Sequence, residues 1–151
     1  MKINFSNQRV LIDQPAIFLA GPTTRTGEIT EWRLEAIKIL RKMNFSGVVY
    51  VPEYLDMKLI DDVGFIKQSE WEREAMENAE VILFWVPRNL DNLPGLTTNV
   101  EFGYWLHSGK VIYGRPKEAE KVKYLDWLYE KETNEKPFDD LEKMLKKIIK
   151  K

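Results

Sequence analysis

One acid, Glu101, stands among apolar and aromatic side chains in the stretch PGLTTNVEFGYW, residues 94–105. A Pro-Gly turn and the polar run TTN precede it. A carboxylate that is partly removed from water becomes more basic, and a hydrogen bond from Asn99 or a threonine would orient it. These residues therefore predict a carboxylate that can act as a base or a nucleophile at the mouth of a loop.

A structural role competes with this chemistry. Thr98 and Glu101 have the spacing of a capping box, in which both side chains satisfy free amides at a helix N-terminus. Ser69 and Glu72 have the same spacing. Spacing alone favours capping for both glutamates. The two roles are compatible, because one carboxylate oxygen can cap the helix while the other faces a ligand.

Apolar runs that alternate with helical patterns predict the framework that holds Glu101. The expected strands are 15–21, 47–54, 81–87 and 110–116, with a further edge strand at 9–13, and residues 55–67 are expected to be irregular. The expected helices are 29–43, 69–79, 98–108, 118–132 and 137–150, the last with Pro137 in its first turn. The helix 98–108 is apolar almost all round, so we expect it to be largely buried. This order predicts one domain over residues 1–151, a doubly wound and mostly parallel α/β sheet of four to five strands flanked by helices.

Polar residues gather in the loops that follow the predicted strands. Ligands of open α/β sheets bind beyond the carboxyl ends of the strands, so we expect these loops to meet at one edge. The polar residues placed there are Thr23, Thr24, Arg25, Glu53, Arg88, Asn89, Asp91, Asn99 and Glu101. The first loop, with Gly21, Pro22, Thr23 and Arg25, could hold a phosphate or a sugar hydroxyl, or it could be a solvated loop. Trp85 could stack on a base or belong to the core.

Composition excludes several other classes of function. The chain has no cysteine and one histidine, His107, which excludes thiolate catalysis, disulfides and a multi-histidine metal site. We expect no metal and no cofactor. The formal net charge of -1 predicts no attraction to a nucleic acid polymer or a membrane surface. Without a membrane-spanning run or a secretory signal, the expected location is cytoplasmic.

Two nucleotide-binding motifs are also excluded. The loop between Gly21 and Gly27 is one residue too long for a phosphate-binding loop of the Walker type, and Glu28 stands where lysine is required. No G-x-G-x-x-G follows the first apolar strand. A nucleoside triphosphatase and a dehydrogenase are therefore not expected.

The stretches IFLAGPTTR, VPE, WEREAMENAEVILFWVPR and LPGLTTNVEFGYWLHSGKVIYGRP resemble the nucleoside 2-deoxyribosyltransferase-like family over about residues 15 to 129. The resemblance implies a flavodoxin-like fold and deoxyribosyl transfer between bases. It makes Glu101 the nucleophile that forms a glycosyl-enzyme ester, and it places Glu72 and Asp91 where relatives carry acids that handle the base and the sugar. Gly95, Thr98 and Asn99, close to the nucleophile, complete the expected substrate-binding set with Arg88 and Glu53.

Several outcomes stay open at this point. The expected partner is a small nucleoside or nucleotide, and the resemblance also implies a homo-oligomer. Hydrolysis of a deoxynucleoside 5′-monophosphate is an alternative to transfer, and a further alternative is a module that binds a nucleotide without turnover. The last is favoured by Ile17, which stands where better-known relatives carry a tyrosine.

Overall fold

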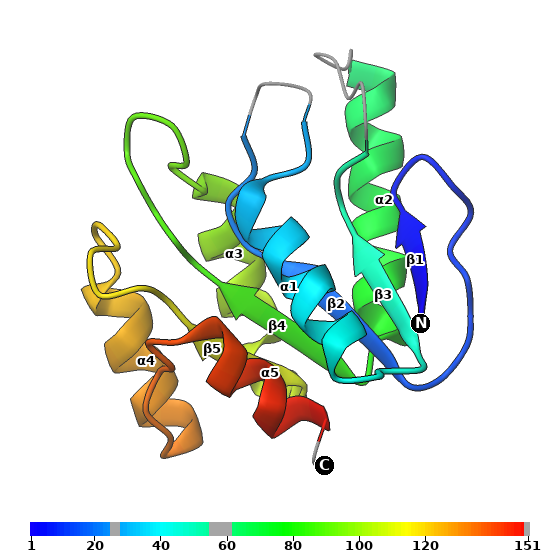
Figure 1. Cartoon of the computed structure of the whole chain (residues 1–151). Coiled ribbons are helices and arrows are strands. Elements are labelled where there is room, and N and C mark those ends of the chain that lie inside the picture. The colour runs from blue at the N-terminus through cyan, green and yellow to red at the C-terminus, as the bar shows by residue number, and fades with distance from the viewer. Residues whose placement is uncertain (25–27, 55–61, 150–151) are drawn as a thin grey trace.

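The computed structural model describes residues 1–24, 28–54 and 62–149. In this part of the chain, five parallel strands form one sheet in the order β1-β3-β2-β4-β5 (Figure 1). The strands are β1 Lys2–Phe5, β2 Ala16–Ala20, β3 Val48–Val51, β4 Val81–Trp85 and β5 Val111–Gly114. The helices are α1 Glu31–Lys42, α2 Asp62–Asn78, α3 Leu96–Trp105, α4 Lys123–Thr133 and α5 Leu141–Ile149, with a 3-10 turn η1 Leu106–Ser108 after α3. None of the described helices is long and apolar enough to cross a bilayer.

Helices cover both faces of the sheet, which confirms the predicted flavodoxin-like α/β fold (Figure 1). Helices α1 and α5 pack on one face, and α2, α3 and α4 pack on the other. Because alternate strand residues point to opposite faces, a strand covered on both sides must be apolar throughout. Strand β2 meets this requirement, since all five of its residues are buried.

The strand order places a switch point at β2. The chain leaves β2 through α1 to reach β3 on one side, and then returns through α2 to β4 on the other side. The loops after β2 and β4 therefore diverge beyond the carboxyl ends of the strands, where ligands of such sheets bind. Gly21 lets these two strand ends approach, because a Cβ atom at this position would lie 2.1 Å from the carbonyl oxygen of Trp85.

The structure corrects several predicted elements. The edge strand is β1 at Lys2–Phe5 instead of 9–13. Helix α2 already includes 62–67, which were expected to be irregular, whereas 55–61 lie outside the described residues. Helices α4 and α5 begin later than predicted, so that Pro137 precedes α5.

Helix α3 is also less buried than predicted. Of its residues only Thr98 and Phe102 are buried, while Leu96, Val100 and Tyr104 are 73%, 72% and 62% exposed. These three residues are spaced four apart and so form one stripe along the helix. Helix α3 thus has an apolar solvent-facing side as well as an apolar core-facing side.

Candidate active site

Two glutamates from neighbouring helices meet at the carboxyl edge of the sheet. Glu72 on α2 and Glu101 on α3 are both half-buried, and their carboxyl groups are hydrogen-bonded to each other. Helices α2 and α3 are also joined by Arg73, whose Nη2 donates to the hydroxyl of Tyr104 at 3.2 Å. A hydrogen bond between two carboxyl groups requires that one of them carries a proton, so the pair can both release and accept one.

The surroundings of the pair favour the protonated form. Burial is the main cause that raises the pKa of Glu101, to about 8, and the charge of Glu72 raises it further while Arg33 opposes both. Burial also raises the pKa of Glu72, against the opposing effects of a hydrogen bond from Gln68 and of Arg33. Two carboxyl groups this close do not ionise independently, so the pair titrates as one unit and retains a proton near neutral pH.

Gln68 fixes the position of Glu72. Its Nε2 donates to Glu72 Oε1 at 2.7 Å and to the carbonyl oxygen of Pro52, also at 2.7 Å. Gln68 lies one helical turn before Glu72 on α2, and Pro52 directly follows β3. The carboxyl group is therefore tied to the end of a central strand.

A buried ion pair lies behind the acid pair. Arg33 Nη1 is 2.9 Å from Glu53 Oε1, and each side chain is 1% exposed. Glu53 also accepts hydrogen bonds from the amide nitrogen and the hydroxyl of Thr30. Glu53 was predicted to bind substrate. Both of its carboxylate oxygens are instead occupied by Arg33 and Thr30, so Glu53 lies behind the acid pair as a supporting residue.

The predicted first loop lies against the loop before α3. Arg33 donates to the carbonyl oxygens of Gly21 and Pro22, and to Thr23 Oγ1 at 3.2 Å. Gly95, at φ +58°, faces Pro22, whose Cγ would be 2.8 Å from an added Cβ atom. The structure therefore brings Gly21, Pro22, Thr23 and Gly95 together. Arg25 lies outside the described residues.

Arg88 connects the end of β4 with α3 and the start of α4. Its guanidinium donates to Asn99 Oδ1, to the carbonyl oxygen of Gly95 and to that of Lys121. Arg88 is 4% exposed, and its Nε is buried without a partner among the described residues. It holds the first turns of α3, and so the backbone that carries Glu101.

Two other predicted site residues, Asp91 and Trp85, make no described hydrogen bond with the glutamate pair. Asp91 is exposed in the loop after β4, where its amide donates to Asn89 Oδ1, and no described contact joins it to the glutamate pair. Trp85 is 6% exposed and packs in the core beneath α1, so little of its ring faces a ligand.

Both predicted capping boxes are wrong. Helix α3 begins at Leu96 with Gly95 as its N-cap, so Thr98, which is buried, and Glu101 both lie inside the helix. Ser69 is in the middle of α2, where its hydroxyl donates to the carbonyl oxygen of Phe65. Glu101 and Glu72 therefore cap neither helix.

Sequence reasoning did not predict the supporting roles of Arg33 and Gln68. Gln68 was not considered, and Arg33 was considered only as one of four arginines that could bind a 5′-phosphate. Arg33 had a detectable signal, since it shares one helical face with Ile37 and Leu40 and is a charged residue within an apolar stripe. Gln68 offered only its spacing of four from Glu72, which is common on helices.

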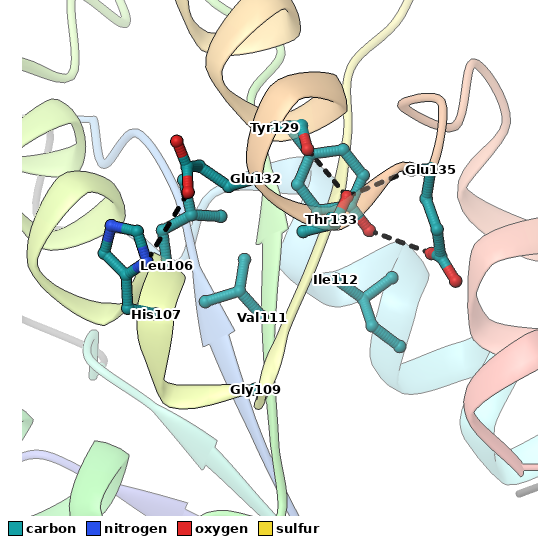
Figure 2. A pocket seen from close by; sticks show the side chains of 9 residues that line it. All are labelled: Leu106, His107, Gly109, Val111, Ile112, Tyr129, Glu132, Thr133 and Glu135. Atoms are coloured by element: carbon teal, nitrogen blue, oxygen red, sulfur yellow. Dashed lines mark hydrogen bonds and ion pairs between the residues drawn. The ribbon is translucent and has the colours of Figure 1, made fainter.

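Two cavities open at the opposite, amino edge of the sheet. One of about 330 Å³ lies between η1 and the end of α4, where Tyr129, Thr133 and Glu135 form a chain of hydrogen bonds (Figure 2). The other, of about 520 Å³, lies between the ends of α1 and α5. Among the described residues, no group of three histidine, aspartate or glutamate side chains could hold a metal ion.

Comparison with known proteins assigns the chain to a family. No curated protein matches it. Residues 14–119 match the family described as nucleoside 2-deoxyribosyltransferase like, and this range contains both glutamates of the pair and the loops around them. Since the match covers more than half of the 151 residues, the chain belongs to the nucleoside 2-deoxyribosyltransferase-like family.

Proposed function

We propose that this protein is an enzyme that moves a deoxyribosyl group between bases, through a covalent ester on Glu101. The observation that carries the proposal is the hydrogen-bonded pair of Glu72 and Glu101 at the carboxyl edge of the sheet. One carboxylate to attack a carbon and one carboxylic acid to protonate a leaving group are what an N-glycosidic bond needs. Family membership supports the same chemistry.

The first half of the reaction forms the ester. An oxygen of the Glu101 carboxylate attacks C1′ of the nucleoside, and the bond between C1′ and the base nitrogen breaks with its electron pair going to the base. Glu101, whose raised pKa leaves it protonated in the resting pair, first passes its proton to Glu72 across their hydrogen bond, and Glu72 gives that proton to the departing base. A covalent intermediate of this kind divides one difficult displacement into two easier ones.

The second half regenerates the enzyme. A nitrogen of the acceptor base attacks C1′, the bond between C1′ and Glu101 breaks, and Glu72 takes back the proton that the acceptor loses. Water in place of the acceptor base would give free deoxyribose instead, so transfer requires that water be kept from the ester. The same two carboxyl groups serve both halves, with Glu72 as acid and then as base.

The other predicted residues surround this pair in the proposal. Gly21, Pro22, Thr23, Gly95 and Asn99 line the two diverging loops, where the sugar would lie. Thr98 supports the nucleophile from within α3. Asp91, exposed in the loop before α3, and Arg25 would approach the sugar from the solvent side.

We propose a nucleoside as substrate in preference to a 5′-monophosphate. Near this edge, three described arginines are already engaged within the protein: Arg33 with Glu53, Arg88 with Asn99 and backbone carbonyls, and Arg115 with Asp126 at 2.9 Å. A phosphate would have to attract them away from these partners, at a cost in stability. Arg25 would then be the residue on which monophosphate binding depends.

An exchange assay tests the proposal. Wild-type protein is incubated with deoxynucleosides or their 5′-monophosphates, with and without an acceptor base, and products are separated by chromatography. Exchange that requires acceptor supports transfer. Release of base without acceptor would mean a hydrolase, and tight binding without product would mean a binding module. Ribonucleosides test selectivity at the 2′ position.

Replacing the nucleophile gives the second test. Glu101→Gln should lower exchange by at least about a thousandfold, because an amide cannot form the ester. The fold should persist, since Glu101 caps no helix and glutamine can still hydrogen-bond to Glu72. Glu70→Gln, an exposed glutamate on the same helix as Glu72, is the matched control. Retained exchange in Glu101→Gln would disprove the assignment.

We further propose that the protein forms a homo-oligomer through the exposed stripe of Leu96, Val100 and Tyr104 on α3. Apolar side chains this exposed are common at subunit contacts. Light scattering should give a multiple of the chain mass for wild type, and Val100→Glu should reduce it. A wild-type protein with the mass of one chain would exclude this proposal.

A further inference from the structure

The Arg33–Glu53 pair is the most deeply buried ion pair among the described residues of the carboxyl edge. Both side chains are 1% exposed, and the two charged atoms lie 2.9 Å apart. Taking both charges out of water costs more than a pair of apolar side chains would, so such pairs need excellent geometry and further hydrogen bonds to persist. The Arg33–Glu53 pair has a close contact and further hydrogen bonds from and to its neighbours, so the fold compensates for its burial.

Arg33 binds the backbone at the end of β2. Its Nε donates to the carbonyl oxygen of Leu19 at 3.0 Å, and its Nη2 donates to that of Gly21 at 2.8 Å. Its Nη1 reaches the carbonyl oxygen of Pro22 and the hydroxyl of Thr23. The planar guanidinium thus holds the loop after β2 in one course, because its donors point in fixed directions.

Arg33 also faces the glutamate pair. Two described charged groups outside the pair act on it: Arg33 on α1 and Glu53 in the segment after β3. Within the pair, Glu72 on α2 and Glu101 on α3 act on each other, and Gln68 is a neutral donor to Glu72. Arg33 is the cation of this set. Its charge lowers the pKa of both Glu72 and Glu101, whereas the charge of Glu53 raises that of Glu72.

We propose that Arg33 is a positioning residue for the reaction at Glu101, which holds the loop after β2 against the substrate and whose charge, balanced by Glu53, keeps one negative charge on the glutamate pair. The inference rests on the proposed function, since the one negative charge that Arg33 keeps on the pair is the charge that Glu101 must carry when it acts as the nucleophile. In the same proposal, the negative charge of Glu53 limits how far Arg33 lowers the pKa of Glu72.

Opposite charges make opposite predictions. Arg33→Met removes the cation, so the pair should hold its proton to higher pH, by about one pH unit. Glu53→Gln removes the balancing anion and leaves Arg33 in place, so the pair should lose its proton at lower pH, by a shift of similar size. A role limited to packing would disturb both variants without moving the titration in opposite directions.

The experiment measures the titration in two independent ways. Carboxyl carbon resonances of protein labelled with ¹³C at glutamate Cδ, assigned by Glu72→Gln and Glu101→Gln, give the titration of the pair without any substrate. The pH profile of kcat/KM for base exchange gives it during turnover. Arg33→Lys keeps the charge and loses the planar donors, so it should keep the wild-type titration while exchange falls about tenfold or more.

Two further variants keep the test decisive. If Arg33→Met does not fold, the double variant Arg33→Met/Glu53→Gln removes both charges together, and its titration should lie between the two single-variant expectations. Lys147→Met, which removes the cation of a half-exposed pair with Glu135 at 2.7 Å on the far edge, should leave titration and exchange as in wild type.

The outcomes separate the two proposals. Opposite shifts in the resonance titration, with no exchange by the wild type, would support the effect of Arg33 on the ionisation of the pair and overturn the proposed function. Equal or absent shifts, in a wild type that does exchange bases, would overturn the role of Arg33 and leave the proposed function standing.

Discussion

The carboxyl edge and the amino edge of the sheet differ in how far their titratable side chains are buried. At the carboxyl edge, Arg33 and Glu53 are withdrawn from water, and Glu72 and Glu101 share a proton between two half-buried carboxyl groups. At the amino edge, His107 and Glu132 form a looser pair, 3.7 Å apart, with the histidine 73% exposed. This second pair lines the smaller of the two cavities (Figure 2).

A cavity and a buried charge differ in how strongly each indicates a functional site. A cavity forms wherever helix ends leave part of a sheet uncovered, and its lining can be ordinary. A buried titratable group must be held against the penalty of leaving water, so the rest of the fold has to compensate for it. Such groups cluster at functional sites, which is why we place the function at the carboxyl edge.

The largest stability effect that we predict tests how closely the carboxyl edge is built. Gly21→Ala should lower the free energy of unfolding by about 3 kcal/mol or more, because the new methyl group would lie 2.1 Å from the carbonyl oxygen of Trp85 at a φ that disfavours side chains. Gly103→Ala, in α3 with no atom within 4 Å of an added Cβ, should raise it by about 0.5 to 1 kcal/mol. Urea unfolding measures both. A Gly21→Ala protein as stable as wild type would mean that β2 and β4 end further apart than we describe.

The strands were the most predictable part of the fold. Strands β2 to β5 are continuous apolar runs because helices cover them on both faces, and such runs are easy to recognise. The edge strand β1 was missed because KINF alternates and pairs with one neighbour, while the more apolar segment 9–13 leaves Leu11 and Ile12 exposed. Composition suggests which residues prefer burial, but not which segment finds a partner.

The sequence predicted where the site lies but not the contacts within it. Placing Glu72 and Glu101 at one edge required only the order of strands and helices. Their hydrogen bond, and the ion pair of Arg33 with Glu53, depend on side chains from four separate segments meeting in space. No spacing along one segment encodes such a meeting. The capping boxes failed for a related reason, since both helices begin earlier than local spacing suggested.

The stability of the protein should depend on pH through Glu101. The pKa of Glu101 is about 8 in the folded protein, above the value of about 4.3 for a free glutamate, so folding favours its protonated form. Its contribution is therefore fully present below about pH 4 and is lost as the pH rises to about 8. Glu101→Gln does not titrate, so its stability relative to wild type should increase over this interval by a few kcal/mol, at up to about 1.4 kcal/mol per pH unit.

Chemical unfolding at several pH values checks this expectation. Above about pH 8 the difference between Glu101→Gln and wild type should be constant, because the folded group is then ionised as well. Glu70→Gln, at an exposed position on α2, is the control variant. A flat difference for Glu101→Gln between pH 4 and 8 would mean that the carboxyl edge does not resist ionisation, and the contrast between the two edges would lose its basis.

The smallest expected effect is at the amino edge. His107→Gln and Glu132→Gln should each change the free energy of unfolding by no more than about 0.5 kcal/mol, because an exposed pair gains little in water and is screened by salt. Exchange of bases should stay within about twofold of wild type, since neither residue is near the carboxyl edge. The His107–Glu132 contact lies on an exposed surface, whereas the Arg33–Glu53 pair is buried, so these two variants are the comparison for what burial adds. If either variant kept its fold but lost exchange tenfold, charge burial would not be what separates the two edges, and the cavity of Figure 2 would have to be considered part of the working site.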